Sequence, residues 1–197
     1  HVAEANEPPQ TPVLLAGDLN RLKSIDVTDR DGSRTSRGSA VYEATPRHAF
    51  VAALKDVPEV WEISYDPKAE DIPIGQVHDF RYREGAFIRG YLNPRRTVLN
   101  QALDDFFFTQ DYSTVLGASR EGTGQVVNLD VRRKIADLPL DGMPHLGSGI
   151  TWDWQGRRVM ASTNLKAAEV TVIDLKDWSV VKRIPTRGPG FFLRSHE

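Results

Sequence analysis

One histidine stands in a setting that suits chemistry. His145 lies in the stretch GMPHLGSGIT, residues 142–151, where small residues follow it and lead into an apolar run. An imidazole can ligate a metal or move a proton near neutral pH. A lone histidine in a turn is more often a hydrogen-bonded structural residue, but the small residues beside this one leave space for something flat. We therefore expect His145 to be presented to a ligand.

Arginines stand beside several strand-like runs of the sequence. The planar guanidinium of arginine binds a carboxylate through two parallel hydrogen bonds, which makes it suited to carboxylate recognition. One histidine and several arginines that face a shared space would suit a flat, metal-bearing ligand with several carboxylates. Any one of these arginines alone is more often simply solvated. The arginines concerned are Arg34, Arg37, Arg95, Arg96, Arg187 and Arg194.

The elements that must position these side chains are short strands. Helical periodicity is scarce, and short β-branched or aromatic runs alternate with turn signals, which predicts an all-β chain. Four segments end alike, in a strand followed by an aspartate that can accept hydrogen bonds from the next turn. These aspartates are Asp18, Asp66, Asp130 and Asp174.

The repeat has the size of a β-propeller blade. Two further strands precede three of the four segments, so each unit holds four antiparallel strands in about 45 residues. The charged, loop-rich residues 67–100 are predicted to form an insertion that connects two blades. A β-sandwich or another stack of sheets is the alternative. The predicted strands lie within 39–43, 49–56 and 60–67, then 104–108, 114–120 and 125–139, and finally 149–153, 157–164 and 169–185.

A propeller would bring the candidate residues together. The loop that leads into the innermost strand of each blade opens near the central axis, so side chains from different blades can converge on one ligand. About four blade equivalents fit in the 197 residues, with the first lacking its inner strands. A propeller closes only as a complete ring of roughly four to eight blades. The chain also starts at His1 rather than Met, so we expect a piece of a longer protein.

Composition excludes several classes of function. Hydrophobic residues make up 40% and charged residues 26%, which is typical of a globular rather than a disordered chain. The net charge of −2 gives no reason to expect nucleic acid or an anionic membrane surface as partner. Because cysteine is absent, the chain cannot form disulfides, thiolate metal sites or a covalent c-type heme link. No apolar run approaches the roughly 20 residues of a membrane span.

Other candidate motifs are weak. Asp104 and Asp105 are adjacent on a predicted strand and should point to opposite faces, so we do not expect the two carboxylates to act together. The glycines of EGTGQ, residues 121–125, join two strands rather than a strand and a helix, which argues against a phosphate loop. Among the other histidines, we interpret His48 as an exposed turn residue and His78 as structural, whereas His196 stays ambiguous.

Five segments of the chain resemble the d1-heme-binding domain of the cytochrome cd1 family. The resemblance covers essentially all 197 residues, and it implies a fragment of about four blades from an eight-bladed β-propeller. Within the family, the sequence is most similar to the branch that acts in heme d1 biosynthesis. The segments are SAVYEATPRHAFVAALKDVPEVWEISYDP, GYLNPRRT, LDDFFFTQDYS, GQVVNLDVRRKIADLPLDGMPHLGSG and IPTRGPGFFLRSHE.

The resemblance implies roles for particular residues. His145 matches the histidine on the distal side of the d1 heme, so it is implied to be a catalytic residue, a cofactor-binding residue and a metal ligand. In the nitrite reductases of the family, a second distal histidine opens the next blade, whereas this chain has Arg187 in PTRGPGF. This difference disfavours nitrite reduction. Arginines of the family hold the heme carboxylates, and the candidates here are Arg37, Arg95, Arg96 and Arg187.

The resemblance also implies an activity and its partners. The expected reaction is oxidation of a propionate side chain of dihydro-heme d1 to the acrylate, the last step of heme d1 biosynthesis. A c-type heme is expected outside this chain, together with a periplasmic electron acceptor, and nitrite reductase is a candidate acceptor of the finished heme d1. The expected location is the periplasm. The alternatives are a nitrite reductase that produces nitric oxide and a non-catalytic carrier of heme d1.

Overall fold

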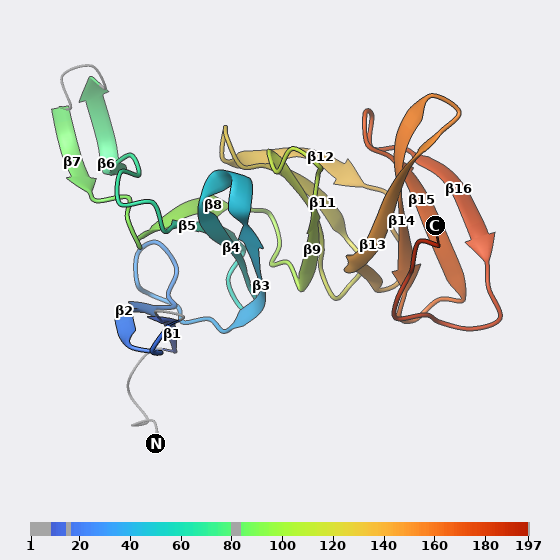
Figure 1. Ribbon diagram of the computed structural model, residues 1–197, viewed down its shortest axis with the longest axis horizontal. Coiled ribbons are helices and arrows are strands. Elements are labelled where there is room, and N and C mark those ends of the chain that lie inside the picture. Colours follow the sequence, from blue (N-terminus) through green and yellow to red (C-terminus); the bar gives the residue numbers. More distant parts are fainter. Residues whose placement is uncertain (1–8, 15–16, 80–83, 197) are drawn as a thin grey trace. The chain divides into compact units, whose positions relative to one another are not determined.

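The computed structural model describes residues 9–14, 17–79 and 84–196 (Figure 1). The chain divides into two compact units, His1–Thr97 and Val98–Glu197. Within the described ranges the secondary structure is β-strand and one 3-10 turn, so the predicted all-β class is confirmed. No helix in this part of the chain is long and apolar enough to cross a membrane.

The second unit consists of two four-stranded antiparallel sheets, each the size of a propeller blade (Figure 1). In both sheets every strand pairs with its neighbour in sequence, as in a meander, and the predicted strands are present. The strand predicted at 149–153 begins earlier, at Pro144, so His145 lies in this strand and not in the turn before it. The first sheet contains β9 (Asp105–Phe108), β10 (Thr114–Ala118), β11 (Gly124–Asn128) and β12 (Arg133–Leu138). The second contains β13 (Pro144–Trp154), β14 (Arg157–Asn164), β15 (Glu169–Asp174) and β16 (Val180–Pro185).

The first unit contains one four-stranded sheet and two hairpins. The sheet has the order β3-β4-β5-β8, and the 3-10 turn η1 (Thr45–Arg47) joins its first two strands. His48 follows this turn with a φ of 49° and is exposed, as expected. The sheet strands are β3 (Gly38–Ala44), β4 (Ala49–Leu54), β5 (Glu59–Ser64) and β8 (Pro94–Val98). The hairpins are β1 (Gln10–Leu14) with β2 (Arg21–Asp26), and β6 (Ile72–Asp79) with β7 (Glu84–Ile88).

The segment 67–100 differs from the expected connection between blades. Its last part forms β8, which lies beside β5 as the fourth strand of the sheet, while β6 and β7 form a separate hairpin. The insertion therefore interrupts one four-stranded sheet between its third and fourth strands. The side chain of His78, predicted to be structural, lies outside the described residues.

Three of the predicted aspartate turns are confirmed. Asp18, Asp66 and Asp174 each accept a hydrogen bond from the backbone N–H two residues further on, at 3.0, 2.8 and 2.8 Å. In the remaining unit, Asn128 takes this role and accepts from the N–H of Asp130 at 3.0 Å. An asparagine side-chain oxygen can close the same kind of turn as a carboxylate.

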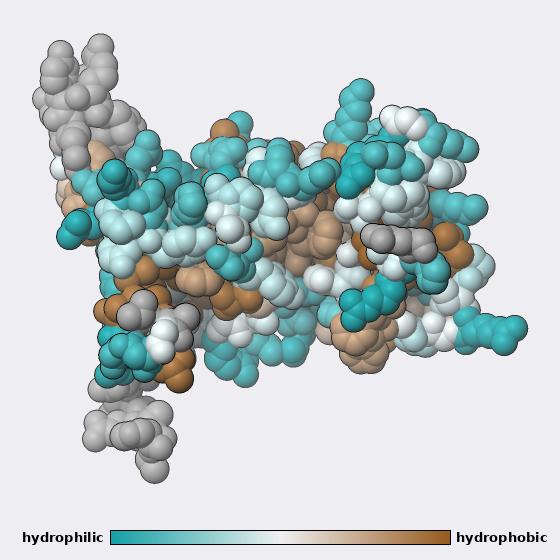
Figure 2. Space-filling model, viewed as in Figure 1, coloured by the Kyte–Doolittle hydropathy of each residue, from teal (hydrophilic) through white to brown (hydrophobic). Residues whose placement is uncertain are grey.

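The core of the second unit fixes the strand that carries His145. A buried cluster joins both sheets, and Leu116, Leu146 and Met160 in it are fully buried. Burying a leucine side chain stabilises a fold by roughly 1.5–3 kcal/mol. Because Leu146 follows His145 directly, its burial anchors the start of β13. The face shown in Figure 2 carries many hydrophilic residues over this unit, with apolar residues gathered in patches.

Candidate functional site

A bulge in β13 presents His145. In the pairing of β13 with β14, His145 lies opposite Thr163 and Ile150 lies opposite Ala161, so the four residues 146–149 face a single residue. Such bulges redirect side chains and are frequent near active sites. Gly149 is in a crowded position, because a Cβ here would lie 2.3 Å from Cε of Met160 and 3.0 Å from the carbonyl oxygen of Leu146. The small residues Gly147, Ser148 and Gly149 noted in the sequence thus lie in the bulge, together with Leu146.

The imidazole of His145 is held by a backbone carbonyl. Its Nδ1 lies 2.6 Å from the carbonyl oxygen of Phe191. A carbonyl oxygen can only accept, so Nδ1 carries a proton and donates it to this bond. The same oxygen accepts from the hydroxyls of Ser148 at 2.7 Å and Thr163 at 3.2 Å. When the ring is neutral, Nε2 is therefore the nitrogen with a free lone pair, which is the atom that can accept a proton or bind a metal.

A carboxylate faces the other nitrogen of the ring. Oδ2 of Asp105 lies 3.6 Å from Nε2 of His145 and accepts a hydrogen bond from the backbone N–H of Gly147 at 2.7 Å. The neighbouring Asp104 instead pairs with Arg120 at 2.8 Å. The two adjacent carboxylates thus point to different partners, as expected. Asp105 was not expected near His145 from the sequence, because the two residues belong to strands of different sheets, β9 and β13.

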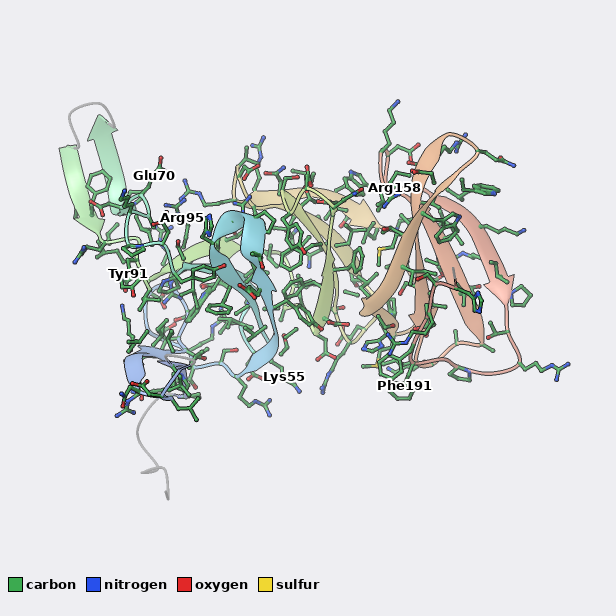
Figure 3. All side chains as sticks on the ribbon, in the orientation of Figure 1. Lys55, Glu70, Tyr91, Arg95, Arg158 and Phe191 are labelled. Atoms are coloured by element: carbon green, nitrogen blue, oxygen red, sulfur yellow. The ribbon has the colours of Figure 1, made fainter. Side chains whose placement is uncertain are left out.

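Two exposed phenylalanines flank His145. The side chains of Phe191 and Phe192 are 63% and 68% exposed, and their ring centroids lie 6.2 and 5.8 Å from that of the imidazole. The guanidinium of Arg194 lies 6.0 Å from the Phe192 ring. Figure 3 shows Phe191 at the end of the β13–β14 sheet remote from Arg158. Exposed aromatic surface beside a polar group is typical of a ligand-binding surface.

Asn164 connects the segments that build this site. Its side chain is buried and accepts hydrogen bonds from the backbone N–H of Met143 at 3.1 Å, and of Lys166 and Ala167 at 2.9 and 2.8 Å. It also donates to the carbonyl of Asp141 at 2.6 Å. The backbone carbonyl of Asn164 accepts from the N–H of Gly190, next to Phe191. Asn164, at the end of β14, thus binds the backbone just before His145 and the backbone just before Phe191.

Arg37 takes part in an ion pair. Its guanidinium makes two hydrogen bonds with the carboxylate of Asp56, at 3.0 and 2.9 Å. These side-chain hydrogen bonds, together with one from the Arg37 backbone N–H, lower the pKa of Asp56 to about 2. The same side-chain hydrogen bond raises the pKa of Arg37. Both side chains are exposed, so a carboxylate ligand would compete with Asp56 for this guanidinium.

Arg96 is partly buried and contacts buried residues of the first unit. It donates to the carboxylate of Glu59 at 2.9 Å and to the carbonyl of Thr28 at 2.6 Å. Its guanidinium carbon lies 4.4 Å from the Trp61 ring centroid, and Trp61 Nε1 donates to Glu59 at 2.8 Å. Glu59 and Trp61 are buried. These contacts favour a structural role for Arg96 over the predicted contact with a ligand carboxylate.

We expect Arg96→Ala to lower the free energy of unfolding by about 2 kcal/mol, because it leaves the buried carboxylate of Glu59 without its cationic partner. Chemical denaturation followed by tryptophan fluorescence measures this change. Arg37→Ala is the matched control and should change stability little, because exposed ion pairs contribute little. Equal stability of both variants would contradict the structural role of Arg96.

The remaining two predicted arginines are more accessible. Arg95 is half-buried and donates to the carbonyl of Glu70 at 3.1 Å (Figure 3). It lines a polar pocket of about 180 Å³ in the first unit. Arg187 is exposed and follows β16. Arg34, a further arginine of the sequence analysis, pairs with Asp29 at 3.1 Å. The convergence of the predicted arginines with His145 on one ligand stays a prediction.

The side chains around His145 could contact a ligand that already contains a metal ion. Within the described ranges, no group of three or more histidine and carboxylate side chains could hold a metal ion. His145 could supply one nitrogen to a metal centred in a flat ring, and the exposed phenylalanines would contact the face or edge of that ring. A metal-bearing macrocycle is thus a ligand that these side chains could contact.

Known proteins resemble this chain over nearly its whole length. The model of the cytochrome D1 heme domain matches residues 1–197. A curated protein from Pseudomonas aeruginosa (strain PAO1), named dihydro-heme d1 dehydrogenase, is 44% identical over 99% of this chain. This chain spans 36% of the length of that relative.

Solved structures show the same likeness. The structure titled dihydro-heme d1 dehydrogenase NirN in complex with DHE matches with a TM-score of 0.79 and 42% identity, covering 96% of this chain and 36% of that one. Hydrazine synthase of Kuenenia stuttgartiensis shares the fold alone, with a TM-score of 0.52 and 11% identity over 88% of this chain and 42% of that one. Because the family model extends over every residue of the sequence, the chain belongs to the cytochrome D1 heme domain family.

Proposed function

We propose that the protein binds a d1-type tetrapyrrole and oxidises a propionate side chain of dihydro-heme d1 to the acrylate. The observation that carries this proposal is the fixed imidazole of His145. Its Nδ1 is engaged by the Phe191 carbonyl, which leaves Nε2 as the reactive nitrogen beside exposed aromatic rings. The likeness to the dihydro-heme d1 dehydrogenase supports the same substrate.

The reaction removes two hydrogen atoms from the side chain. Two C–H bonds break and one C=C bond forms, so two protons and two electrons must leave. In the proposal, Nε2 of His145 accepts one proton as general base and the second proton passes to solvent. The electrons go to an oxidant of the c-type heme class, expected outside this chain, and then to a periplasmic acceptor.

Arginines are proposed to hold the carboxylates of the substrate. Fixing a substrate through its remote carboxylates positions the reacting side chain near the base and lowers the barrier. Arg187 and Arg95 are the better-supported members of the predicted set, because Arg37 and Arg96 already pair with Asp56 and Glu59. The proposed location is the periplasm, and nitrite reductase is the proposed acceptor of the finished heme d1.

The visible spectrum tests this function. The natural protein that carries this chain is mixed with dihydro-heme d1 and an oxidised electron acceptor, and the spectrum is followed with time. Conversion to the spectrum of heme d1 supports the dehydrogenase. Binding without conversion identifies a carrier instead, and nitric oxide formed from nitrite with a reduced donor identifies a nitrite reductase.

A further inference from the structure

We propose that Arg120 binds a peripheral carboxylate of the tetrapyrrole, because the turn between β10 and β11 places an available guanidinium at the same end of the second unit as His145. The inference rests on the proposed function, since it takes the d1-type tetrapyrrole as the ligand. Arg120 lies in a turn between the second and third strands of its sheet, not before a first strand, and was therefore not among the arginines expected from the sequence.

Strand pairing places the turn 119–123 at the end of the unit that carries His145. Ala118, the last residue of β10, pairs with Asp105, the first residue of β9. The carboxylate of Asp105 in turn lies 3.6 Å from Nε2 of His145. The turn that follows β10 therefore starts beside the histidine site.

The same turn touches the segment that leads to His145. A Cβ on Gly122 would overlap the carbonyl oxygen of Gly142, so the two backbones are in close contact. The turn is closed by a hydrogen bond from the Gly122 N–H to the Ser119 carbonyl at 3.1 Å. Because the backbone that carries Arg120 is already fixed, little of its conformational freedom is lost when a ligand binds.

The guanidinium of Arg120 is oriented on one side and available on the other. Its Nε donates to Oδ1 of Asp104 at 2.8 Å, and the backbone N–H of Asp104 donates to the Ala118 carbonyl at 2.8 Å. The arginine side chain is 59% exposed. Its two terminal nitrogens make no hydrogen bond with any residue that the structure describes. Asp104 therefore fixes the direction of the side chain and leaves both terminal nitrogens for a ligand.

A carboxylate at the edge of a tetrapyrrole matches this position. A tetrapyrrole has its metal at the centre and its acidic side chains at the periphery, so a residue that binds one of them must lie beside the histidine rather than against it. The terminal nitrogens of an arginine can bind both oxygens of a carboxylate. Arg133 is also exposed, but it pairs with Asn128 at the opposite end of β11, which makes it a matched control.

Arg120→Ala tests this role through the affinity for the ligand. We expect the Kd of the natural protein for dihydro-heme d1 to rise about 10-fold, because hydrogen bonds between charged groups are lost. Arg120→Lys keeps the charge but loses the planar fork, so its Kd should lie between the two. Arg133→Ala should bind as the unmodified protein does. Titration of the tetrapyrrole-free protein followed by the visible spectrum measures Kd, and thermal unfolding checks that each variant is folded.

A ligand without free carboxylates shows which group Arg120 meets. Methyl esters of the acidic side chains of dihydro-heme d1 remove their negative charges but keep the ring. The unmodified protein should lose about 10-fold more affinity on esterification than Arg120→Ala does, because the variant already lacks this part of the interaction. The double variant Asp104→Asn/Arg120→Ala should bind dihydro-heme d1 as weakly as Arg120→Ala, since repulsion by the uncovered Asp104 carboxylate is not the cause.

The outcomes distinguish this inference from the function on which it rests. A Kd of Arg120→Ala within about twofold of the unmodified value, an equal loss on esterification in both proteins, or full affinity of the double variant would each overturn the inference. If the unmodified protein still converts dihydro-heme d1 to heme d1, the proposed function then stands. If Arg120→Ala weakens binding as expected but the unmodified protein converts nothing, the carboxylate contact stands and the proposed oxidation is wrong.

Discussion

His145→Ala is expected to slow the conversion of dihydro-heme d1 by roughly 10²- to 10⁴-fold, the usual contribution of a general base. The substitution removes Nε2, the only ring nitrogen that the Phe191 carbonyl leaves available. Tetrapyrrole binding should largely persist, because aromatic contacts and arginines remain. The rate of spectral conversion measures the first effect, and titration of the apoprotein with tetrapyrrole measures the second.

A second substitution separates structure from chemistry at the same position. His145→Asn can place its amide N–H near the position of Nδ1 and keep the bond to the Phe191 carbonyl, but it has no counterpart of Nε2. We expect it to be as slow as His145→Ala. His48→Asn is the control, since His48 is an exposed turn residue and asparagine tolerates its φ of 49°. Turnover that survives in both His145 variants would remove this residue from the mechanism.

Asn164→Ala is expected to destabilise the second unit by about 2–4 kcal/mol and to reduce turnover at the same time. The substitution deletes four hydrogen bonds of a buried side chain and leaves three backbone N–H groups and one carbonyl without this partner. Each such bond contributes about 0.5–1.5 kcal/mol. Because these bonds fix the residues just before His145, the imidazole should also lose its orientation. Urea unfolding and the conversion assay measure the two effects.

Asn128→Ala is the matched control for this prediction. Asn128 also ends a strand and accepts from two backbone N–H groups, at 3.0 Å each, but it belongs to the other sheet of the unit. Its loss should cost about 1 kcal/mol and leave turnover unchanged in the folded protein. A stable and fully active Asn164→Ala protein would show that the network around Asn164 does not position the site.

The strands could be predicted from the sequence because their signals are local. Alternation of β-branched and aromatic residues with turn residues places the strands of both sheets of the second unit. The same is true of the turn aspartates, whose side chains reach only two residues along the chain. The bulge after His145 was not predicted, although its small residues Gly147, Ser148 and Gly149 were noted. The insertion was less predictable, because whether β8 joins β5 depends on pairing across about 30 intervening residues.

The roles of individual charged residues depended on the fold. Arg37, Arg95, Arg96 and Arg187 are alike in sequence, since each stands in or beside a loop. In the structure Arg96 stacks on Trp61 and pairs with the buried Glu59, whereas Arg187 is exposed. No local pattern distinguishes these two settings, because burial is decided by residues from distant strands.

The sequence by itself determined the all-β class and the four-stranded repeat, because these follow from periodicity over a few positions. Only the tertiary structure decided what the imidazole meets. The carboxylate of Asp105 and the carbonyl of Phe191 come from points 40 residues before and 46 residues after His145 in the chain. A backbone carbonyl carries no sequence signal at all. Which carboxylate lies beside the ring is decided by the packing of the two sheets.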